Sequence, residues 1–265
     1  MNRDWEKLKD TIIQWMKDIR PTIIESFNQP LTVETKANLN DLVTDIDKSV
    51  EKFLSEKVYA LYPEDNIVGE EGINNNETSE KGYTWYIDPI DGTMNFVHQK
   101  ENFCISVAVY EGNIGKLGVI YDVMSNEFYY GIQGKGAFKN EESLKPFSDV
   151  QLQHALIGMN SSWLIPNKKV NYESIVEVVR NVRGVRSYGS ACLELATVAT
   201  QKLDAYLSLN LSPWDYASGK IIVEELGGVA LNLKNETLDV RKKKSTILIG
   251  NKNVCNKIIE IINKD

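Results

Sequence analysis

The sequence is poor in cysteine and histidine, with three and two copies among 265 residues. Cys104, Cys192 and Cys255 lack the spacing of a metal site and are too few and scattered for a disulfide framework. No apolar run approaches the roughly 20 residues that a membrane helix needs, and the amino terminus is too charged for a signal peptide. We therefore expect a cytoplasmic protein with reduced thiols and no membrane partner.

Positive charge is also scarce. The chain has 30 Lys and Arg against 37 Asp and Glu, which gives a formal net charge of -7. This balance excludes a chain-wide basic surface, so we expect no nucleic-acid partner. The local basic run Arg241–Lys244 is typical of a solvated loop. The composition is otherwise that of a globular protein, with 42% apolar and 25% charged residues, and excludes disorder.

Hydrophobic periodicity predicts different organisation in the two halves. Helical spacing covers about residues 3–28 and 44–62, and β-rich runs over 103–132 indicate an antiparallel meander. After the polar stretch near Pro146, strand-like pieces alternate with helical patterns. We therefore expect an α+β domain over residues 1–145 that carries metal-binding motifs, and an α/β domain over 146–265 that completes the site.

The sharpest local feature is the segment Asp88-Pro-Ile-Asp91-Gly-Thr93. An apolar strand delivers Asp88 to its carboxyl end, and Gly92 permits a turn into a helix that starts near Thr93. Two carboxylates then lie beside backbone N–H groups. Hard cations such as Mg²⁺ prefer the carboxylates, and phosphate prefers the N–H groups. A capped turn with Asp as the N-cap explains the same residues.

Three further acidic groups follow strands or precede helices: Glu70 with Glu71, Asp215 after Trp214, and the segment Asp41–Asp47. Each alone is explained by a loop acid or a helix cap. Together they lie where α/β proteins build ligand sites, and grouped carboxylates repel one another unless cations neutralise them. The joint interpretation is a polynuclear Mg²⁺ site beside a phosphate cradle, able to activate water and to stabilise a leaving alkoxide.

Residues Trp85–His98 resemble the first signature of the inositol monophosphatase family, and Trp214–Gly228 resemble its second. Asp41–Asp47, Gly69–Glu71 and Gly189–Ala191 match further segments of that family, in the same order and with similar spacing. The resemblance covers nearly the whole chain. It implies α/β architecture in a layered αβαβα sandwich, a homodimer, and the lithium sensitivity common among family members.

The resemblance also implies roles for individual residues. The first Mg²⁺ would be held by Glu70, Asp88 and the Ile90 carbonyl, the second by Asp88, Asp91 and Asp215, and a weaker third with help from Glu70. Thr93, paired with Asp47, would orient the attacking water, so that the implied catalytic residues are Glu70, Thr93 and Asp47. The implied substrate contacts are Asp91, Gly92, Thr93, Gly189, Ser190, Ala191 and Asp215.

One position departs from the family pattern. Members tuned to inositol carry a Glu seven residues before the Asp that matches Asp215, and here that position is Ser208. A carboxylate there would accept bonds from sugar hydroxyls and repel a second phosphate. We therefore expect a Mg²⁺-dependent phosphomonoesterase for small phosphorylated alcohols, an inositol-1-monophosphatase with relaxed specificity. Fructose-1,6-bisphosphatase or NADP(H) 2′-phosphatase activity is the alternative, and a non-catalytic cation-binding module is a more distant one.

Overall fold

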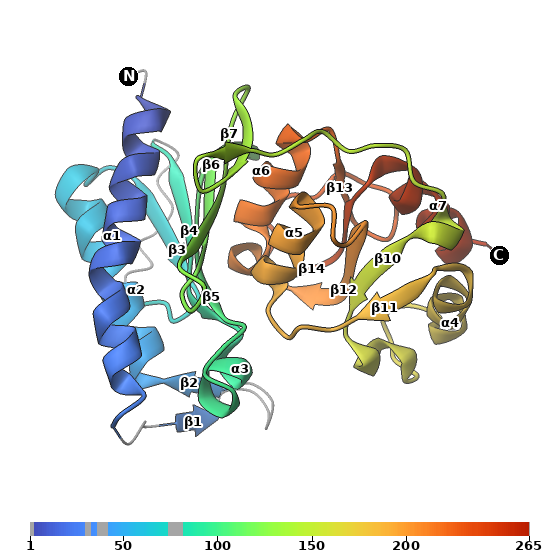
Figure 1. The fold of residues 1–265 in the computed structure, drawn as a ribbon, viewed down its shortest axis with the longest axis horizontal. Helices are drawn as coiled ribbons and strands as arrows, with labels where there is room; N and C mark the ends of the chain where they lie inside the picture. The colour runs from blue at the N-terminus through green and yellow to red at the C-terminus, as the bar shows by residue number, and fades with distance from the viewer. Residues whose placement is uncertain (1–2, 30–32, 36–41, 74–81, 265) are drawn as a thin grey trace.

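Helix and sheet layers alternate through the protein. The computed structural model describes residues 3–29, 33–35, 42–73 and 82–264 (Figure 1). One face of a seven-stranded sheet is covered by α1 (Trp5–Ser26) and α2 (Asp45–Leu61). Between this sheet and a five-stranded sheet lie α5 (Ala191–Ala199) and α6 (Ala217–Glu225), and the outer face of the second sheet carries α4 (Tyr172–Asn181) and α7 (Lys252–Ile262). The αβαβα sandwich implied by the resemblance is confirmed.

The two amino-terminal helices form where the apolar spacing predicts them. In α1 the buried side chains include Leu8, Ile12 and Ile23, and the Asp4 side chain caps the helix by accepting a bond from the Lys7 N–H. In α2 the cap is Thr44, whose hydroxyl accepts bonds from the N–H groups that follow it. Among the described residues, none of the helices combines the length and apolar character needed to cross a membrane.

The seven-stranded sheet has the order β3-β4-β5-β6-β7-β8-β9. Only β3 and β4 pair in parallel, and the remaining pairs are antiparallel, which confirms the predicted meander. Helices cover both faces of the central strands, so Ile105, Val107 and Val109 of β5 face one core while Ala108 and Tyr110 face the other. The strands are β3 (Asn66–Gly69), β4 (Thr84–Asp91), β5 (Cys104–Glu111), β6 (Ile114–Asp122), β7 (Glu127–Ile132), β8 (Gly136–Lys139) and β9 (Glu142–Ser143).

The five-stranded sheet has the order β11-β10-β12-β14-β13. Its β10 strand runs parallel to β11 and β12, whereas β14 runs antiparallel to β12 and β13. These strands are β10 (Leu156–Met159), β11 (Gly184–Arg186), β12 (Ala205–Leu211), β13 (Val229–Leu231) and β14 (Ser245–Gly250). The shorter elements are β1 (Val33–Thr35), β2 (Leu42–Thr44), α3 (Thr93–His98), η1 (Leu152–His154), η2 (Ser161–Leu164) and η3 (Pro213–Asp215).

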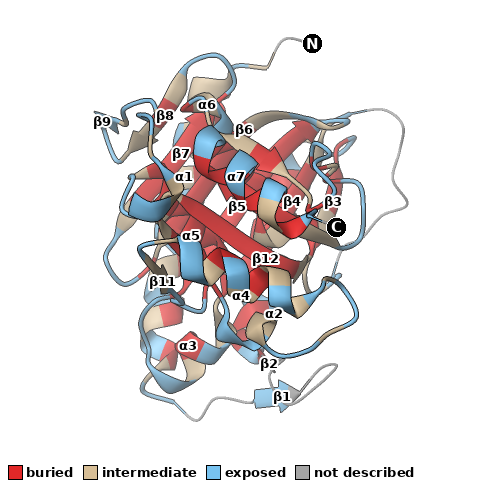
Figure 2. Cartoon of the chain, turned by 90° about the vertical axis from the view of Figure 1, so that its right-hand side faces the viewer, coloured by how far each residue is buried: buried red, intermediate tan, exposed pale blue. Residues whose placement is uncertain are grey.

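Apolar side chains fill the spaces between the layers as separate clusters, and buried residues concentrate on the strands (Figure 2). The central cluster joins residues of the first sheet, α5, α6 and the second sheet. The first sheet ends at Ser143 and the second begins at Leu156, on either side of the expected boundary. Because the central cluster spans both halves, their division into two domains stays a prediction.

A glycine on β6 allows α6 to lie directly against the first sheet. A Cβ atom on Gly118 would lie 2.6 Å from the Ser218 carbonyl oxygen and 2.9 Å from the Ser218 Cα, both of them backbone atoms. We predict that Gly118→Ala lowers the free energy of unfolding by about 1–3 kcal/mol, because the helix must move away from the sheet. Urea unfolding monitored by circular dichroism measures this change.

The matched control is Gly184→Ala on β11, where an added Cβ would meet its nearest atoms at 3.4 Å, an ordinary contact distance. Equal unfolding free energies for the two variants would contradict the close approach of α6 to β6.

Candidate active site

The ends of β3 and β4 bring the first two acidic groups together. The two strands are parallel, with Gly69 opposite Ile87, and the Glu70 N–H donates to the Ile87 carbonyl at 3.2 Å. Parallel strands end at the same edge of a sheet, so Glu70 and Asp88, the next residues along the two strands, lie side by side near that edge. The β4 strand is irregular between Asp88 and Asp91, which turns the chain toward α3.

Gly92 makes the turn between β4 and α3. Its φ of 96° and ψ of 39° lie in the left-handed region, which glycine adopts without a steric penalty. A Cβ there would also lie 3.1 Å from both the Asn102 carbonyl oxygen and the Ser190 Cβ. Glycine is therefore required at position 92 both for the left-handed backbone and for the close contact. It places the first turn of α3 beside the segment that contains Gly189 and Ser190.

Thr93 and Asp47 meet as the resemblance implied. The Thr93 hydroxyl lies 3.3 Å from Asp47 Oδ1 and 3.1 Å from the Ile90 carbonyl oxygen. Asp47 Oδ2 accepts bonds from the Thr44 N–H and hydroxyl at the start of α2. Burial raises the pKa of Asp47 to about 7, although the Thr44 bonds act in the opposite direction. Thr44 thus caps α2, as the capping interpretation allowed, while Asp47 completes the capping box and is also the partner of Thr93.

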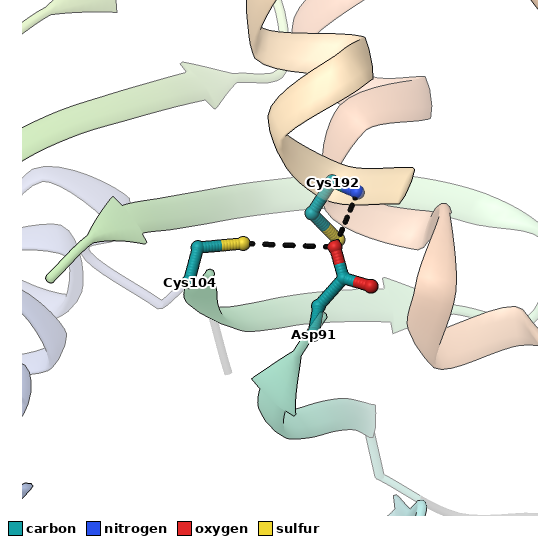
Figure 3. A group of neighbouring side chains, drawn as sticks. All are labelled: Asp91, Cys104 and Cys192. Carbon is teal, nitrogen blue, oxygen red and sulfur yellow. Dashed lines mark hydrogen bonds between the residues drawn. The ribbon is translucent and has the colours of Figure 1, made fainter. Parts of the chain in front are cut away.

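Asp91 is held by the start of α5. Its Oδ2 accepts bonds from the Ser190 hydroxyl at 2.6 Å and the Cys192 N–H at 2.6 Å, and its Oδ1 accepts one from the Ala191 N–H at 3.2 Å. The Cys104 thiol donates to the same Oδ2 at 3.7 Å, and Figure 3 shows both cysteines beside that oxygen. Residues distant in sequence therefore orient this carboxylate.

The remaining carboxylates are the buried Asp88 and the half-buried Glu70 and Asp215, and their charges act on one another. Burial raises the pKa of Asp88 well above its usual value, and the charges of Glu70, Asp91 and Asp215 raise it further. Asp215 accepts the Ser212 N–H at 2.8 Å, and its pKa is raised by burial and by Asp91 and Glu70. Within the described parts of the chain, the buried Asp88 Oδ1 has no hydrogen-bond partner. A buried acceptor among like charges requires a cation or a proton.

This donor set fits a hard divalent cation. Carboxylate and carbonyl oxygens are the ligands that Mg²⁺ prefers, and the unsatisfied Asp88 Oδ1 supplies a free donor atom. The sulfur atoms of Cys104 and Cys192 lie near the Asp91 carboxylate, with the ligand atoms of all three residues within 4.8 Å of one another. Thiols are soft donors that Mg²⁺ avoids. Both cysteines are free and buried, so they form the wall behind Asp91.

The structure therefore brings members of all four acidic groups to one place: Asp47, Glu70, Glu71, Asp88, Asp91 and Asp215. Asp45 is exposed, and Asp41 lies outside the described residues. Of the expected substrate loop, Ser190 and Ala191 contact Asp91, and Gly189 lies against Asn95. Sequence reasoning missed the contacts of Cys104 and Cys192 with this site, because only the fold brings the two thiols together. Their spacing in the sequence carries no signal of it.

Comparison with known proteins places the chain among named relatives. The model of the inositol monophosphatase family matches residues 4–264. The inositol-1-monophosphatase of Bacillus subtilis (strain 168) is 40% identical over 257 residues, 97% of each chain. The fructose-1,6-bisphosphatase/inositol-1-monophosphatase of Thermotoga maritima is 31% identical over 256 residues, 96% of this chain and 95% of the relative. A crystal structure of an IMPase/NADP phosphatase complexed with Mg²⁺ and phosphate has a TM-score of 0.90 at 27% identity, covering 99% of this chain and 97% of that one.

The fold, the acidic site and these matches define the chain as a phosphoric monoester hydrolase. It belongs to the inositol monophosphatase family.

The buried carboxylates predict an unusual pH dependence of stability without metal. The pKa of Asp47 rises from 3.8 to about 7 on folding, so the folded protein binds its proton more tightly than the unfolded chain does. The free energy of unfolding of the metal-free protein should therefore fall as the pH rises through that window, and Asp88 and Asp215 act in the same direction. Added Mg²⁺ should raise the melting temperature more at about pH 8 than at about pH 5.

Differential scanning calorimetry with and without Mg²⁺ measures both effects, and Na⁺ at matched ionic strength serves as the control. An equal gain in melting temperature at the two pH values would contradict the picture of mutually repelling carboxylates.

Proposed function

We propose that the protein is a Mg²⁺-dependent phosphomonoesterase that hydrolyses small phosphorylated alcohols, with inositol 1-phosphate among its substrates. The single observation that carries this proposal is the unpartnered, buried Oδ1 of Asp88. It lies among the charges of Glu70, Asp91 and Asp215, next to the turn at Gly92. The relatives of known name support the same chemistry.

The proposed metal ligands are Glu70, Asp88, Asp91, Asp215 and the Ile90 carbonyl. When bound there, Mg²⁺ supplies positive charge for the phosphoryl oxygens and lowers the pKa of water. The chain itself orients these ligands: α5 fixes Asp91 through its first N–H groups, and the Ser212 N–H fixes Asp215. The ligands are therefore pre-organised before the substrate arrives.

Thr93 and Asp47 are the proposed pair that handles the proton of the attacking water. When the Thr93 hydroxyl donates to Asp47, its lone pairs can accept a hydrogen bond from water. The contact between the two side chains places Asp47 to take up a proton through Thr93. The Gly92 and Thr93 N–H groups, at the start of α3, would receive the phosphate.

The second part of the proposal is a relaxed specificity for the alcohol half of the substrate. Ser208 replaces the carboxylate that inositol-tuned members carry, so one hydroxyl acceptor is lost and one source of repulsion toward phosphate is removed. The names of the Thermotoga maritima relative and of the IMPase/NADP phosphatase include other phosphate esters. Fructose 1,6-bisphosphate and the 2′-phosphate of NADP are therefore candidate substrates. The homodimer, the lithium sensitivity and the cytoplasmic location stay predictions.

The direct test is phosphate release by Asp88→Asn. The amide removes the charge that would hold Mg²⁺ while it keeps the shape of the side chain, so kcat should fall by at least about 10²–10³-fold. Colorimetric phosphate detection with inositol 1-phosphate measures this change, with Asp18→Asn on the exposed face of α1 as the matched control. Undiminished release by Asp88→Asn, or by the wild type with all divalent cations chelated, would contradict the proposal.

A further inference from the structure

The basic run Arg241–Lys244 lies beside the acidic site. Lys244 directly precedes β14, and Ser245, the first residue of that strand, pairs with Leu211 of β12. The next residue after Leu211 is Ser212, whose N–H holds the Asp215 carboxylate at 2.8 Å. Lys244 is therefore opposite the segment that leads into Asp215, at the site end of the β12–β14 pair.

The charges at this end of the second sheet are uneven. Arg241 is fixed by Asp239, with Nε to Oδ1 and Nη2 to Oδ2 distances of 2.8 Å each. Lys242, Lys243 and Lys244 are exposed, and within the described part of the chain none of them forms an ion pair. Three neighbouring ammonium groups repel one another, so the run favours an anion near it.

The two strands that adjoin this run, β12 and β14, contain no Asp or Glu. Ser208, buried at 3% exposure and opposite Ile247, occupies the position of the missing family carboxylate. Asp239 binds Arg241 at the start of the run, and the two strands add no further negative charge beside Lys243 and Lys244.

We propose that Lys242–Lys244 form a subsite for a second phosphoryl group, so that the enzyme prefers phosphomonoesters that carry another phosphate or a pyrophosphate. This inference rests on the proposed phosphatase activity and specifies its substrate class. A substrate with its scissile ester at the carboxylate site would then extend its second anionic group across Ser212 toward the lysines. Because the lysines are exposed, salt should weaken their contact with the second anionic group of the substrate.

The test compares the triple variant Lys242→Ala, Lys243→Ala, Lys244→Ala with the wild type at fixed Mg²⁺ and ionic strength. The kcat/KM for fructose 1,6-bisphosphate should fall about 10-fold more than that for inositol 1-phosphate, and the difference should shrink at high salt. Lys244→Glu should give a larger difference in the same direction. Lys234→Ala, an exposed lysine in the same β13–β14 connection, is the matched control.

An equal change for both substrates in the triple variant, or no change for either, would overturn the subsite while leaving the phosphatase proposal intact. If the wild type releases no phosphate from either ester with Mg²⁺ present, the phosphatase proposal and the subsite both fail.

A second, independent observation concerns Glu51, one helical turn after Asp47 on α2. Glu51 is 1% exposed, and its Oε2 accepts the Glu71 N–H at 2.7 Å while its Oε1 accepts the Ile73 N–H at 2.9 Å. A Cβ on Gly69 would lie 2.4–2.6 Å from the three atoms of the Glu51 carboxylate. The carboxylate therefore contacts the backbone on both sides of Glu70.

We infer that Glu51 is a positioning residue that fixes Glu70 for Mg²⁺. Neither oxygen of Glu51 is oriented by a side-chain cation in the described residues, so its bonds to the loop are what hold it in place. In Glu51→Gln the amide group keeps the size of the side chain but can accept only one of the two N–H groups. The loop that carries Glu70 should then lose part of its order.

Isothermal titration calorimetry with Mn²⁺ tests this role without substrate. We expect Glu51→Gln to weaken Mn²⁺ binding by about 10-fold, as changes behind a metal ligand commonly do, and excess Mg²⁺ to restore most of the activity. Gly69→Ala, which displaces the same carboxylate, should weaken binding in the same direction. Glu56→Gln, on the exposed face of the same helix, is the matched control. Unchanged Mn²⁺ affinity in both test variants would overturn the inference.

Discussion

The repulsion between buried carboxylates is the constraint on which the site depends. Burial opposes the ionisation of Asp88, Asp91 and Asp215 by raising their pKa values, and the charges of neighbouring carboxylates raise the pKa values of Asp88 and Asp215 further. In a medium of low polarity such repulsion is far stronger than in water. A fold that keeps these groups together must supply N–H donors for some oxygens and leave others for cations, and the structure does both.

The layered architecture supplies these donors from both halves of the chain. The parallel β3–β4 pair sets Glu70 beside Asp88, and the first turn of α5, which lies between the sheets, surrounds Asp91 with donors. The short η3 segment directs Asp215 into the same place. Gly118 and Gly92 allow the close approaches that this geometry needs. The interface between the layers is thus both a core of the protein and the support of its site.

Sequence reasoning could identify the acidic site because its residues are grouped in short segments with strong local signals. Asp88, Gly92 and Thr93 follow one strand, and the strand–turn–helix pattern is visible in the residues themselves. The long helices could also be predicted, since the apolar stripes of α1 and α2 extend over many turns. Family resemblance supplied the roles of individual residues, which composition and spacing alone left open.

The residues that support the site could not be predicted from the sequence in this way. Glu51 is a glutamate in an amphipathic helix, and no local pattern distinguishes it from a solvated surface residue. Cys104 and Cys192 meet only because β5 and α5 pack together. The run at Lys244 indicates a loop, and its position opposite Ser212 follows from the β12–β14 register, which a sequence does not specify. Contacts between distant segments therefore limit what the sequence can tell.

The most direct test of the central claim is a crystal soaked in Mn²⁺, with anomalous diffraction used to locate the ions. The account predicts anomalous peaks that are shared by Asp88 and its neighbours Glu70, Asp91 and Asp215. An absence of density at Asp88 in crystals that hydrolyse inositol 1-phosphate, or density only beside the thiols of Cys104 and Cys192, would contradict it.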